Sequence, residues 1–210
     1  MRSIAGADIY GITSEEHSLG RDNITVVKAM IDAGITLIQY REKEKTLLEK
    51  YRQCEILRRL TKDAGVTFIV NDHVDLAIAM EADGVHVGQD DLPVSVVRQL
   101  VGASVIIGLS THSPAQATAA AEAGADYIGV GPIFATQTKK DVCDTVGFTY
   151  LDHVVKMQKI PFVAIGGIKE NNIASVRARG AETIALVSEI VGADTISTRV
   201  KNIRKNMENK

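Results

Sequence analysis

The sequence predicts an α/β fold of the (β/α)8 class, a TIM barrel, and three observations lead to this prediction. Short runs rich in β-branched residues alternate with longer amphipathic segments along the chain. Eight such runs are present, which is the strand number of this barrel. The chain has 210 residues, near the lower end of the length that the fold occupies.

The predicted strands and helices follow one another in strict alternation. Helices are predicted between the strands, for example over residues 23–34, 46–65 and 113–125. Alternating βα units imply parallel strands joined by right-handed crossovers. An open doubly wound sheet is the alternative, but it has less reason to stop at eight equal units. In chain order the strands are predicted over residues 8–13, 36–42, 67–72, 84–88, 104–110, 127–133, 161–167 and 183–189.

A glycine recurs just before several of the predicted strands. It stands in the segments DAGIT, DAGVT, EADGV, EAGAD and ARGAE. Glycine suits the C-terminal cap of a helix, where a positive φ is needed. Each segment therefore predicts the end of a helix and the turn into the next strand.

The composition limits the classes of function. The hydrophobic content of 45% and the charged content of 24% are ordinary for a globular protein, and a net charge of −2 gives no reason to expect nucleic acid or a membrane as a partner. Cys54 and Cys143 lie far apart, which argues against a zinc site or a disulfide framework and fits a reducing compartment. Neither a signal-peptide pattern nor an apolar run of about 20 residues is present. We expect one barrel domain over residues 1–210, located in the cytoplasm, with self-association into a homo-oligomer left open.

Acidic residues follow two neighbouring predicted strands. Asp72 ends the third strand, and Asp90 and Asp91 follow the fourth. The carboxyl ends of barrel strands gather on one face, and adjacent strands lie about 4.8 Å apart. Two close carboxylates repel each other unless a cation lies between them, and few oxygen ligands of this kind suit Mg²⁺. The pattern predicts a magnesium site, with Asn71 as a neutral donor beside it.

Basic residues follow the second predicted strand, in the stretch QYREK. Alternation along the strand points Gln39, Arg41 and Lys43 to one side, toward the mouth of the barrel. Two cations next to a magnesium site indicate a diphosphate as the ligand.

A second group of anion-binding residues is predicted across the mouth. Thr136, Thr138 and Lys139 follow the sixth strand and offer hydroxyl and ammonium donors for a phosphate. The loops after the seventh and eighth strands often bind phosphate through backbone N–H groups in this fold. The residues placed for that role are Gly166, Gly167, Val187 and Ser188. Two anion sites are therefore expected, one with a metal ion and one without.

The joint set of motifs resembles the thiamine-phosphate synthase family. The set is QYREK, VNDHVDLAIAMEADGVHVGQDDLP, IIGLSTHS, ADYIGVGPIFATQTK and VAIGGI, in this order, and the match covers nearly the whole chain. The resemblance implies a Mg²⁺-dependent transferase of thiamine biosynthesis. Such an enzyme joins 4-amino-2-methyl-5-(diphosphooxymethyl)pyrimidine to 4-methyl-5-(2-phosphoethyl)thiazole, or to its carboxylated form. It releases pyrophosphate in a dissociative substitution.

The resemblance also assigns residues by position. Asp72 and Asp91 would bind Mg²⁺, and Arg41, Lys43, Lys139 and Ser110 would act on the leaving group or on the pyrimidine. The pyrimidine diphosphate would contact Gln39, Tyr40, Arg41, Glu42, Lys43, Asn71, Ser110 and Lys139, and the thiazole phosphate would contact Thr136, Gln137, Thr138, Gly167, Val187 and Ser188. Tyr40 and His73 depart from the family's usual residues, and so does the start of the loop after the first strand.

Two alternatives remain from the sequence. Thiazole tautomerase relatives share the fold, and in such an enzyme His112 could serve as an acid or base. They tend to lose the paired acids and the Thr-x-Thr-Lys loop, both of which are intact here. A noncatalytic barrel that binds thiazole phosphate for regulation would have no use for a complete magnesium and diphosphate set. His86 is interpreted as a core histidine or as a group with a chemical role.

Overall fold

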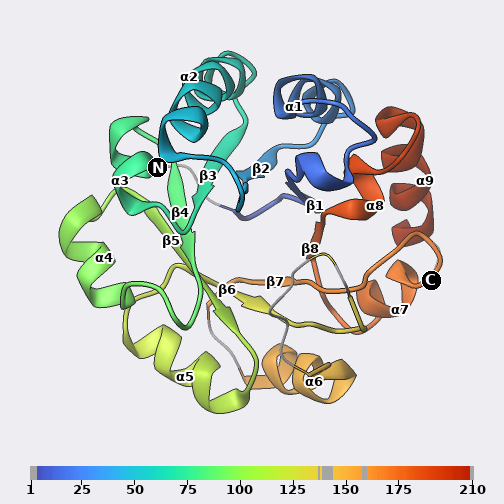
Figure 1. Cartoon of the computed structure of the whole chain (residues 1–210). Coiled ribbons are helices and arrows are strands. Elements are labelled where there is room, and N and C mark those ends of the chain that lie inside the picture. Colours follow the sequence, from blue (N-terminus) through green and yellow to red (C-terminus); the bar gives the residue numbers. More distant parts are fainter. Residues whose placement is uncertain (1–3, 137, 139–143, 158–159, 209–210) are drawn as a thin grey trace.

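Eight parallel strands close into a barrel with helices around it, which confirms the predicted fold class (Figure 1). The computed structural model describes residues 4–136, 138, 144–157 and 160–208. Each strand pairs with the next along the chain, and the eighth pairs with the first. The strands are β1 (Ile9–Ile12), β2 (Leu37–Tyr40), β3 (Thr67–Asn71), β4 (Gly84–Val87), β5 (Ile106–Thr111), β6 (Tyr127–Val130), β7 (Phe162–Ala164) and β8 (Thr183–Leu186).

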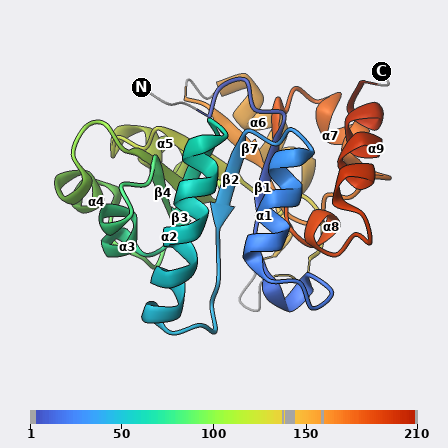
Figure 2. The same ribbon diagram turned by 90° about the horizontal axis from the view of Figure 1, so that it is seen from above.

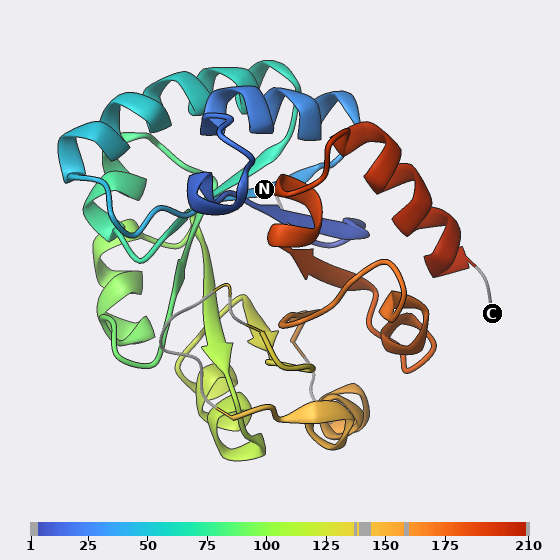
Figure 3. The ribbon, with the colours of Figure 1, turned by 45° about the vertical axis from the view of Figure 1, so that its right-hand side comes forward.

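The helices surround the barrel, as Figures 1 and 3 show. Helix α1 begins after Asp22, whose side chain accepts a hydrogen bond from the Thr25 N–H, and α2 begins with a capping box of Thr46 and Glu49. One 3-10 turn, η1 (Glu15–His17), follows β1. The helices are α1 (Asn23–Asp32), α2 (Leu47–Asp63), α3 (Val74–Ala79), α4 (Val94–Val101), α5 (Pro114–Glu122), α6 (Gly147–Met157), α7 (Ile173–Arg177), α8 (Ser188–Val191) and α9 (Ile196–Glu208).

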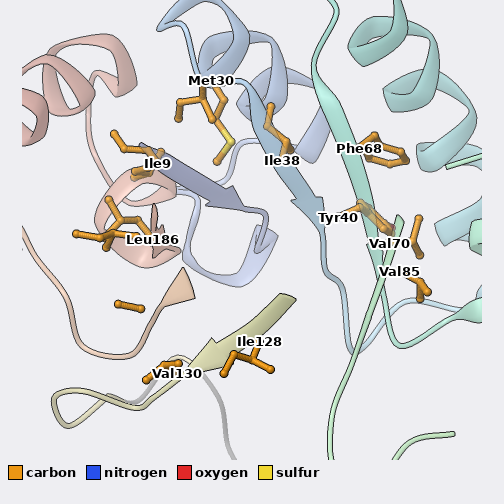
Figure 4. Packing of buried hydrophobic residues seen from close by; sticks show 14 of the residues in the cluster. Ile9, Met30, Ile38, Tyr40, Phe68, Val70, Val85, Ile128, Val130 and Leu186 are labelled. Atoms are coloured by element: carbon orange, nitrogen blue, oxygen red, sulfur yellow. The ribbon is translucent and has the colours of Figure 1, made fainter. Parts of the chain in front are cut away.

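Apolar side chains form two layers because side chains alternate along each strand. One layer lies between the strands and the helices, where Figure 4 shows Ile38, Tyr40 and Phe68. The other fills the inside of the barrel and includes Tyr10 and Tyr127. The inward positions of each strand therefore decide what lies below the mouth.

The glycines before the strands mostly behave as predicted, with one exception. Gly34, Gly65, Gly124 and Gly180 have positive φ after a helix. Gly84 does not, and the prediction of a helix cap at EADGV is wrong, because Glu81 takes the positive φ there and Gly84 begins β4. A Cβ at Gly84 would lie 2.5 Å from Ile69 Cδ1 and 2.6 Å from the Ile106 carbonyl oxygen. This glycine is needed for close packing inside the barrel.

The carboxyl ends of the strands open at one end of the barrel. In Figure 2 the two chain ends lie on the side opposite to the strand arrowheads, and α8 lies on the arrowhead side. The mouth is therefore built from the loops that follow the strands. In the described part of the chain, no helix combines the length and the apolar character that crossing a bilayer requires.

Candidate active site

The mouth contains a pocket of about 620 Å³. Arg41, Glu42 and Lys43 line it from the loop after β2, Ser14 and Glu15 from the loop after β1, and Thr138 from the loop after β6. A smaller hollow of about 350 Å³ lies outside the barrel between α3 and α4. Of the predicted site residues, Arg41, Glu42, Lys43 and Thr138 line the first of these.

Asp72 is held in a conformation that non-glycine residues seldom adopt. Its φ is 61°, in the left-handed region that aspartate tolerates better than most residues, and its N–H donates to the His86 carbonyl oxygen at 2.8 Å. The sharp turn follows directly on the last residue of β3. Lys43 Nζ lies 2.5 Å from Asp72 Oδ2.

Asp91 lies near Asp72, as the sequence predicts, and each carboxyl group acts on the pKa of the other. Burial and the charge of Asp72 raise the pKa of Asp91, although the Gly88 N–H donates to its Oδ2 at 2.7 Å. Burial also acts to raise the pKa of Asp72, but the hydrogen bond and charge of Lys43 outweigh it and hold that pKa below its usual value.

This carboxylate pair fits a hard divalent cation. Without a cation the second carboxylate ionises with difficulty, and a bound metal ion would remove that cost. Among the described residues, no group of three or more His, Cys, Asp or Glu side chains could hold a metal. A metal held by Asp72 and Asp91 would thus keep waters or take oxygens from a ligand, as Mg²⁺ commonly does.

The loop after β2 presents its cations to the pocket. The Arg41 N–H donates to Thr13 Oγ1 at 2.9 Å, and Thr13 Oγ1 donates to the Arg41 carbonyl oxygen at 3.4 Å, which ties this loop to the loop after β1. Arg41 and Lys43 both line the pocket. Gln39 points into the barrel and is only 2% exposed. Any contact it makes with a ligand lies at the floor of the mouth.

Two side chains of the stretch QYREK have partners outside the pocket. Tyr40, the last residue of β2, lies in the outer apolar layer, and its hydroxyl donates to Gln53 Oε1 on α2 at 2.9 Å. The predicted contact of Tyr40 with the pyrimidine diphosphate stays a prediction, and it would have to be made by the backbone. Glu42 lines the pocket, but its Oε1 accepts hydrogen bonds from the Glu15 N–H and from Asn23 Nδ2, both at 2.9 Å. Its carboxylate is thereby tied to the loop after β1 and to α1.

A chain of hydrogen bonds crosses the inside of the barrel below the pocket. Gln39 Nε2 donates to the Tyr10 hydroxyl at 2.9 Å, and the hydroxyls of Tyr10 and Tyr127 lie 3.0 Å apart. His86 joins Tyr127 to Ser110, with 2.9 Å from Nδ1 to the Tyr127 hydroxyl and 2.9 Å from Nε2 to Ser110 Oγ. Sequence reasoning missed Tyr10 and Tyr127, although the strand alternation places both inward.

The opposite side of the mouth is built from backbone. Gly166 and Gly167 follow β7 with φ of 99° and 62°. A Cβ on Gly167 would lie 2.5 Å from the Ala135 carbonyl oxygen, so the loops after β6 and β7 touch there. Val187 caps the N-terminus of α8, and Ser188 begins that helix.

Thr138 connects the two sides of the mouth. Its hydroxyl lies 3.3 Å from Ser188 Oγ and 3.3 Å from Thr136 Oγ1, and the residue also lines the pocket beside Arg41 and Lys43. The predicted metal and diphosphate side and the predicted phosphate side therefore face one space.

Arg199 of α9 supports the loops after β7 and β8. Its Nη1 lies 2.5 Å from Glu189 Oε1 and 3.1 Å from Glu170 Oε2. The Glu170 N–H also donates to Glu189 Oε1 at 3.2 Å. These contacts fix the spacing between the loop of Gly167 and the start of α8.

The remaining predicted residues fall into three groups. Asn71 ends β3 in register with His86. His112 follows β5, and its Nδ1 lies 2.6 Å from the Gly131 carbonyl oxygen, which fixes the ring. Gln137 and Lys139 lie outside the described residues, so their assignments stay predictions.

Known proteins share both the sequence and the fold. A family model described as thiamine monophosphate synthase matches residues 9–190. A thiamine-phosphate synthase of Pelotomaculum thermopropionicum is 67% identical over 94% of this chain and 91% of its own, and one of Lawsonia intracellularis is 56% identical over 95% and 92%. The solved thiamine phosphate pyrophosphorylase from Pyrococcus furiosus has a TM-score of 0.87 and 34% identity, covering 96% of each chain.

These likenesses extend over nearly the full barrel, including both sides of the mouth. The chain therefore belongs to the thiamine monophosphate synthase family, transferases of thiamine biosynthesis that act on small phosphorylated substrates.

Proposed function

We propose that this chain condenses 4-amino-2-methyl-5-(diphosphooxymethyl)pyrimidine with 4-methyl-5-(2-phosphoethyl)thiazole, or its carboxylated form, and releases pyrophosphate in a Mg²⁺-dependent reaction. One observation carries the proposal. Thr138 lines the pocket together with Arg41 and Lys43, and its hydroxyl lies 3.3 Å from Ser188 Oγ, so the two predicted anion-binding sides adjoin one another. A reaction between one diphosphate and one monophosphate substrate needs this arrangement.

The diphosphate side is assigned to Lys43, Arg41, Asp72 and Asp91. A metal ion held by the two aspartates would neutralise charge on the departing pyrophosphate. Arg41 and Lys43 line the pocket and supply positive charge to the same group. Lys139, outside the described residues, is assigned the same task by the family resemblance alone.

The substitution is proposed to be dissociative. The bond between the methylene carbon of the pyrimidine and the diphosphate oxygen breaks first, and pyrophosphate leaves with the electron pair. The pyrimidine methyl cation that forms is stabilised by its amino group and captured by the thiazole nitrogen. In this route the protein's main tasks are to stabilise negative charge on the leaving group and to hold the nucleophile nearby. The cations at the end of β2 suit the first task.

The thiazole phosphate is assigned to the other side of the mouth. The Gly167 loop and the start of α8 would offer backbone N–H groups, and the hydroxyls of Ser188 and Thr138 would add donors. Thr136 supports Thr138, whose N–H donates to Thr136 Oγ1 at 3.3 Å. This side requires no metal ion.

The test is pyrophosphate release with both substrates, in the presence and absence of Mg²⁺, with the product followed by mass spectrometry. The expected result is release that depends on Mg²⁺ and matches thiamine phosphate formed. Isomerisation of the thiazole phosphate alone, without pyrophosphate release, would instead support a tautomerase. Binding of the thiazole phosphate without any turnover would support a regulatory barrel.

A further inference from the structure

The hydrogen-bond chain inside the barrel has a direction, which follows from counting hydrogens. Gln39 Nε2 can only donate, so the Tyr10 oxygen accepts and the Tyr10 hydrogen remains for its neighbour, the Tyr127 oxygen. The Tyr127 hydrogen then goes to His86 Nδ1. That nitrogen must be the unprotonated one.

The far end of the chain is decided by the same count. A histidine whose Nδ1 accepts carries its proton on Nε2, so His86 Nε2 donates to Ser110 Oγ. The Ser110 hydroxyl, as an acceptor from His86, keeps its own hydrogen for another partner. Ser110 is half-buried at the end of β5, facing the mouth.

The surroundings keep the chain neutral and in place. Burial raises the pKa values of Tyr10 and Tyr127 far above the usual tyrosine value, so both hydroxyls stay protonated. Room for the chain comes from Gly108, where a Cβ would lie 2.2 Å from Tyr127 Cζ and 2.5 Å from His86 Nδ1. The backbone of Ser110 is fixed as well, because Gln89 Nε2 donates to its carbonyl oxygen at 2.6 Å.

We propose that this chain of hydrogen bonds makes Ser110 an obligate hydrogen-bond donor toward the mouth, and that Ser110 thereby recognises a ring nitrogen of the aminopyrimidine. His86, Tyr127 and Tyr10 are then positioning residues that act through Ser110. The inference rests on the proposed function for the identity of the ligand. A ring nitrogen fits better than a phosphate oxygen, because Ser110 Oγ lies 2.9 Å from His86 Nε2 inside the barrel, whereas Arg41 and Lys43, the cations of the diphosphate side, line the pocket at the loop after β2.

The first test measures the protonation of His86 without substrate or metal. Long-range ¹H–¹⁵N correlation spectra of protein labelled with ¹⁵N-histidine report which ring nitrogen carries the proton, and His86→Asn identifies the signal. The expected result near pH 7.5 is a neutral ring with the proton on Nε2. A neutral ring with its proton on Nδ1 would overturn the proposal, since Ser110 would then have to donate its own hydrogen to Nε2.

A variant tests whether the chain sets that state. Tyr127→Phe removes the donor to Nδ1 and is expected to give a mixture of the two tautomers. Tyr150→Phe is the matched control, because it removes a buried hydroxyl that donates to Thr111 Oγ1 at 2.7 Å and takes no part in the chain. An unchanged His86 spectrum in Tyr127→Phe would contradict the proposal. If that variant does not fold, Tyr10→Phe makes the same test one link further away.

The second test identifies the atom that Ser110 meets. Binding of the aminopyrimidine diphosphate is compared with binding of two analogues, each with one ring nitrogen replaced by CH. The unmodified protein should bind one of the analogues about 3- to 10-fold more weakly than the parent compound, which is the contribution of one hydrogen bond. Ser110→Ala should bind that analogue and the parent compound equally. Equal losses in both proteins would overturn the assignment of Ser110 to a ring nitrogen.

The two tests separate this inference from the proposed function. If the unmodified chain does not bind the aminopyrimidine diphosphate, the proposed function and the ring-nitrogen assignment both fail. The spectrum of His86 would still decide whether Ser110 is a donor.

Discussion

The two sides of the mouth that are proposed to bind anions are built from different chemical groups. The acidic side, formed by Lys43, Asp72 and Asp91, presents charged side chains, and one carboxyl there has a raised pKa. The glycine side, formed by Gly166, Gly167 and Ser188, presents backbone that has positive φ or begins a helix. A side-chain site can be tuned by a single charge, whereas a backbone site depends on how closely two loops approach.

The largest effect is expected on the acidic side, from Asp91→Asn. The amide keeps an acceptor for the Gly88 N–H but loses the charge, so kcat should fall about 10³-fold, since a metal ion contributes several kcal/mol to such a step. The measurement is steady-state pyrophosphate release at saturating Mg²⁺. Asp90→Asn, at the exposed neighbouring position, is the matched control and should retain activity. Full activity of Asp91→Asn would remove Asp91 from the metal site.

On the glycine side, Gly167→Ala should raise the KM for the thiazole phosphate roughly 10- to 100-fold, the contribution of one or two hydrogen bonds to a charged group. The added methyl group meets the Ala135 carbonyl oxygen at a φ of 62° and pushes the two loops apart. Gly102→Ala is the control, because Gly102 has a φ of 74° with no heavy atom within 4 Å of the added Cβ. The Gly102→Ala variant therefore measures the effect of backbone strain without a steric clash. Equal KM values for the two variants would contradict a phosphate site at Gly167.

Ser188→Ala should have a smaller effect than Gly167→Ala. It removes one hydroxyl donor but keeps the backbone N–H at the start of α8, so the KM for the thiazole phosphate should rise about 3- to 10-fold. Steady-state kinetics with the thiazole phosphate varied measure this directly. A loss as large as that of Gly167→Ala would show that the side chain, and not the backbone, binds the phosphate.

The smallest effect concerns stability without metal. The folded-state pKa of Asp91 is raised, so its ionised form destabilises the fold at pH values above that pKa, and the destabilisation disappears as the pH falls below it. Asp91→Asn should therefore raise the Tm by about 1–2 °C at pH 7.5 in buffer that contains a chelator. Solvent screening reduces the destabilisation by such a half-exposed like-charge contact to about 0.5 kcal/mol.

The pH dependence of that difference provides the check. The Tm difference between Asp91→Asn and the unmodified chain should shrink as the pH falls through the raised folded-state pKa of Asp91 toward 3.8, the usual aspartate value, because the destabilisation is lost over that interval. Asp72 behaves in the opposite way, because its pKa is lowered and its stabilisation is lost as the pH falls. A lower Tm for Asp91→Asn at pH 7.5 would mean that the carboxylate pair is not repulsive.

The elements of the fold could be predicted well from the sequence because its signals are local and repeated. Eight β-branched runs separated by amphipathic segments are enough to count the strands. The prediction for Gly84 was wrong because a helix cap and a close contact inside the barrel both require glycine. Local pattern does not separate these two causes.

Part of the candidate site was also readable. The meeting of Asp72 and Asp91 follows from the place of each at the end of adjacent strands. The stretch QYREK does not present all its side chains to the mouth, because alternation turns Tyr40 outward into the apolar layer under the helices. Strict use of that alternation would have found Tyr10 and Tyr127.

The sequence by itself determined the number and order of the strands and the residue types that follow them, since these depend on periodicity and on the geometry of parallel strands. Only the tertiary structure decided which groups touch. The positive φ of Asp72, the contact between Thr138 and Ser188, and the chain from Gln39 to Ser110 all join residues far apart in the sequence or depend on backbone angles that no local pattern specifies. Their geometry arises only when the barrel closes and brings the strands and the loops that follow them together.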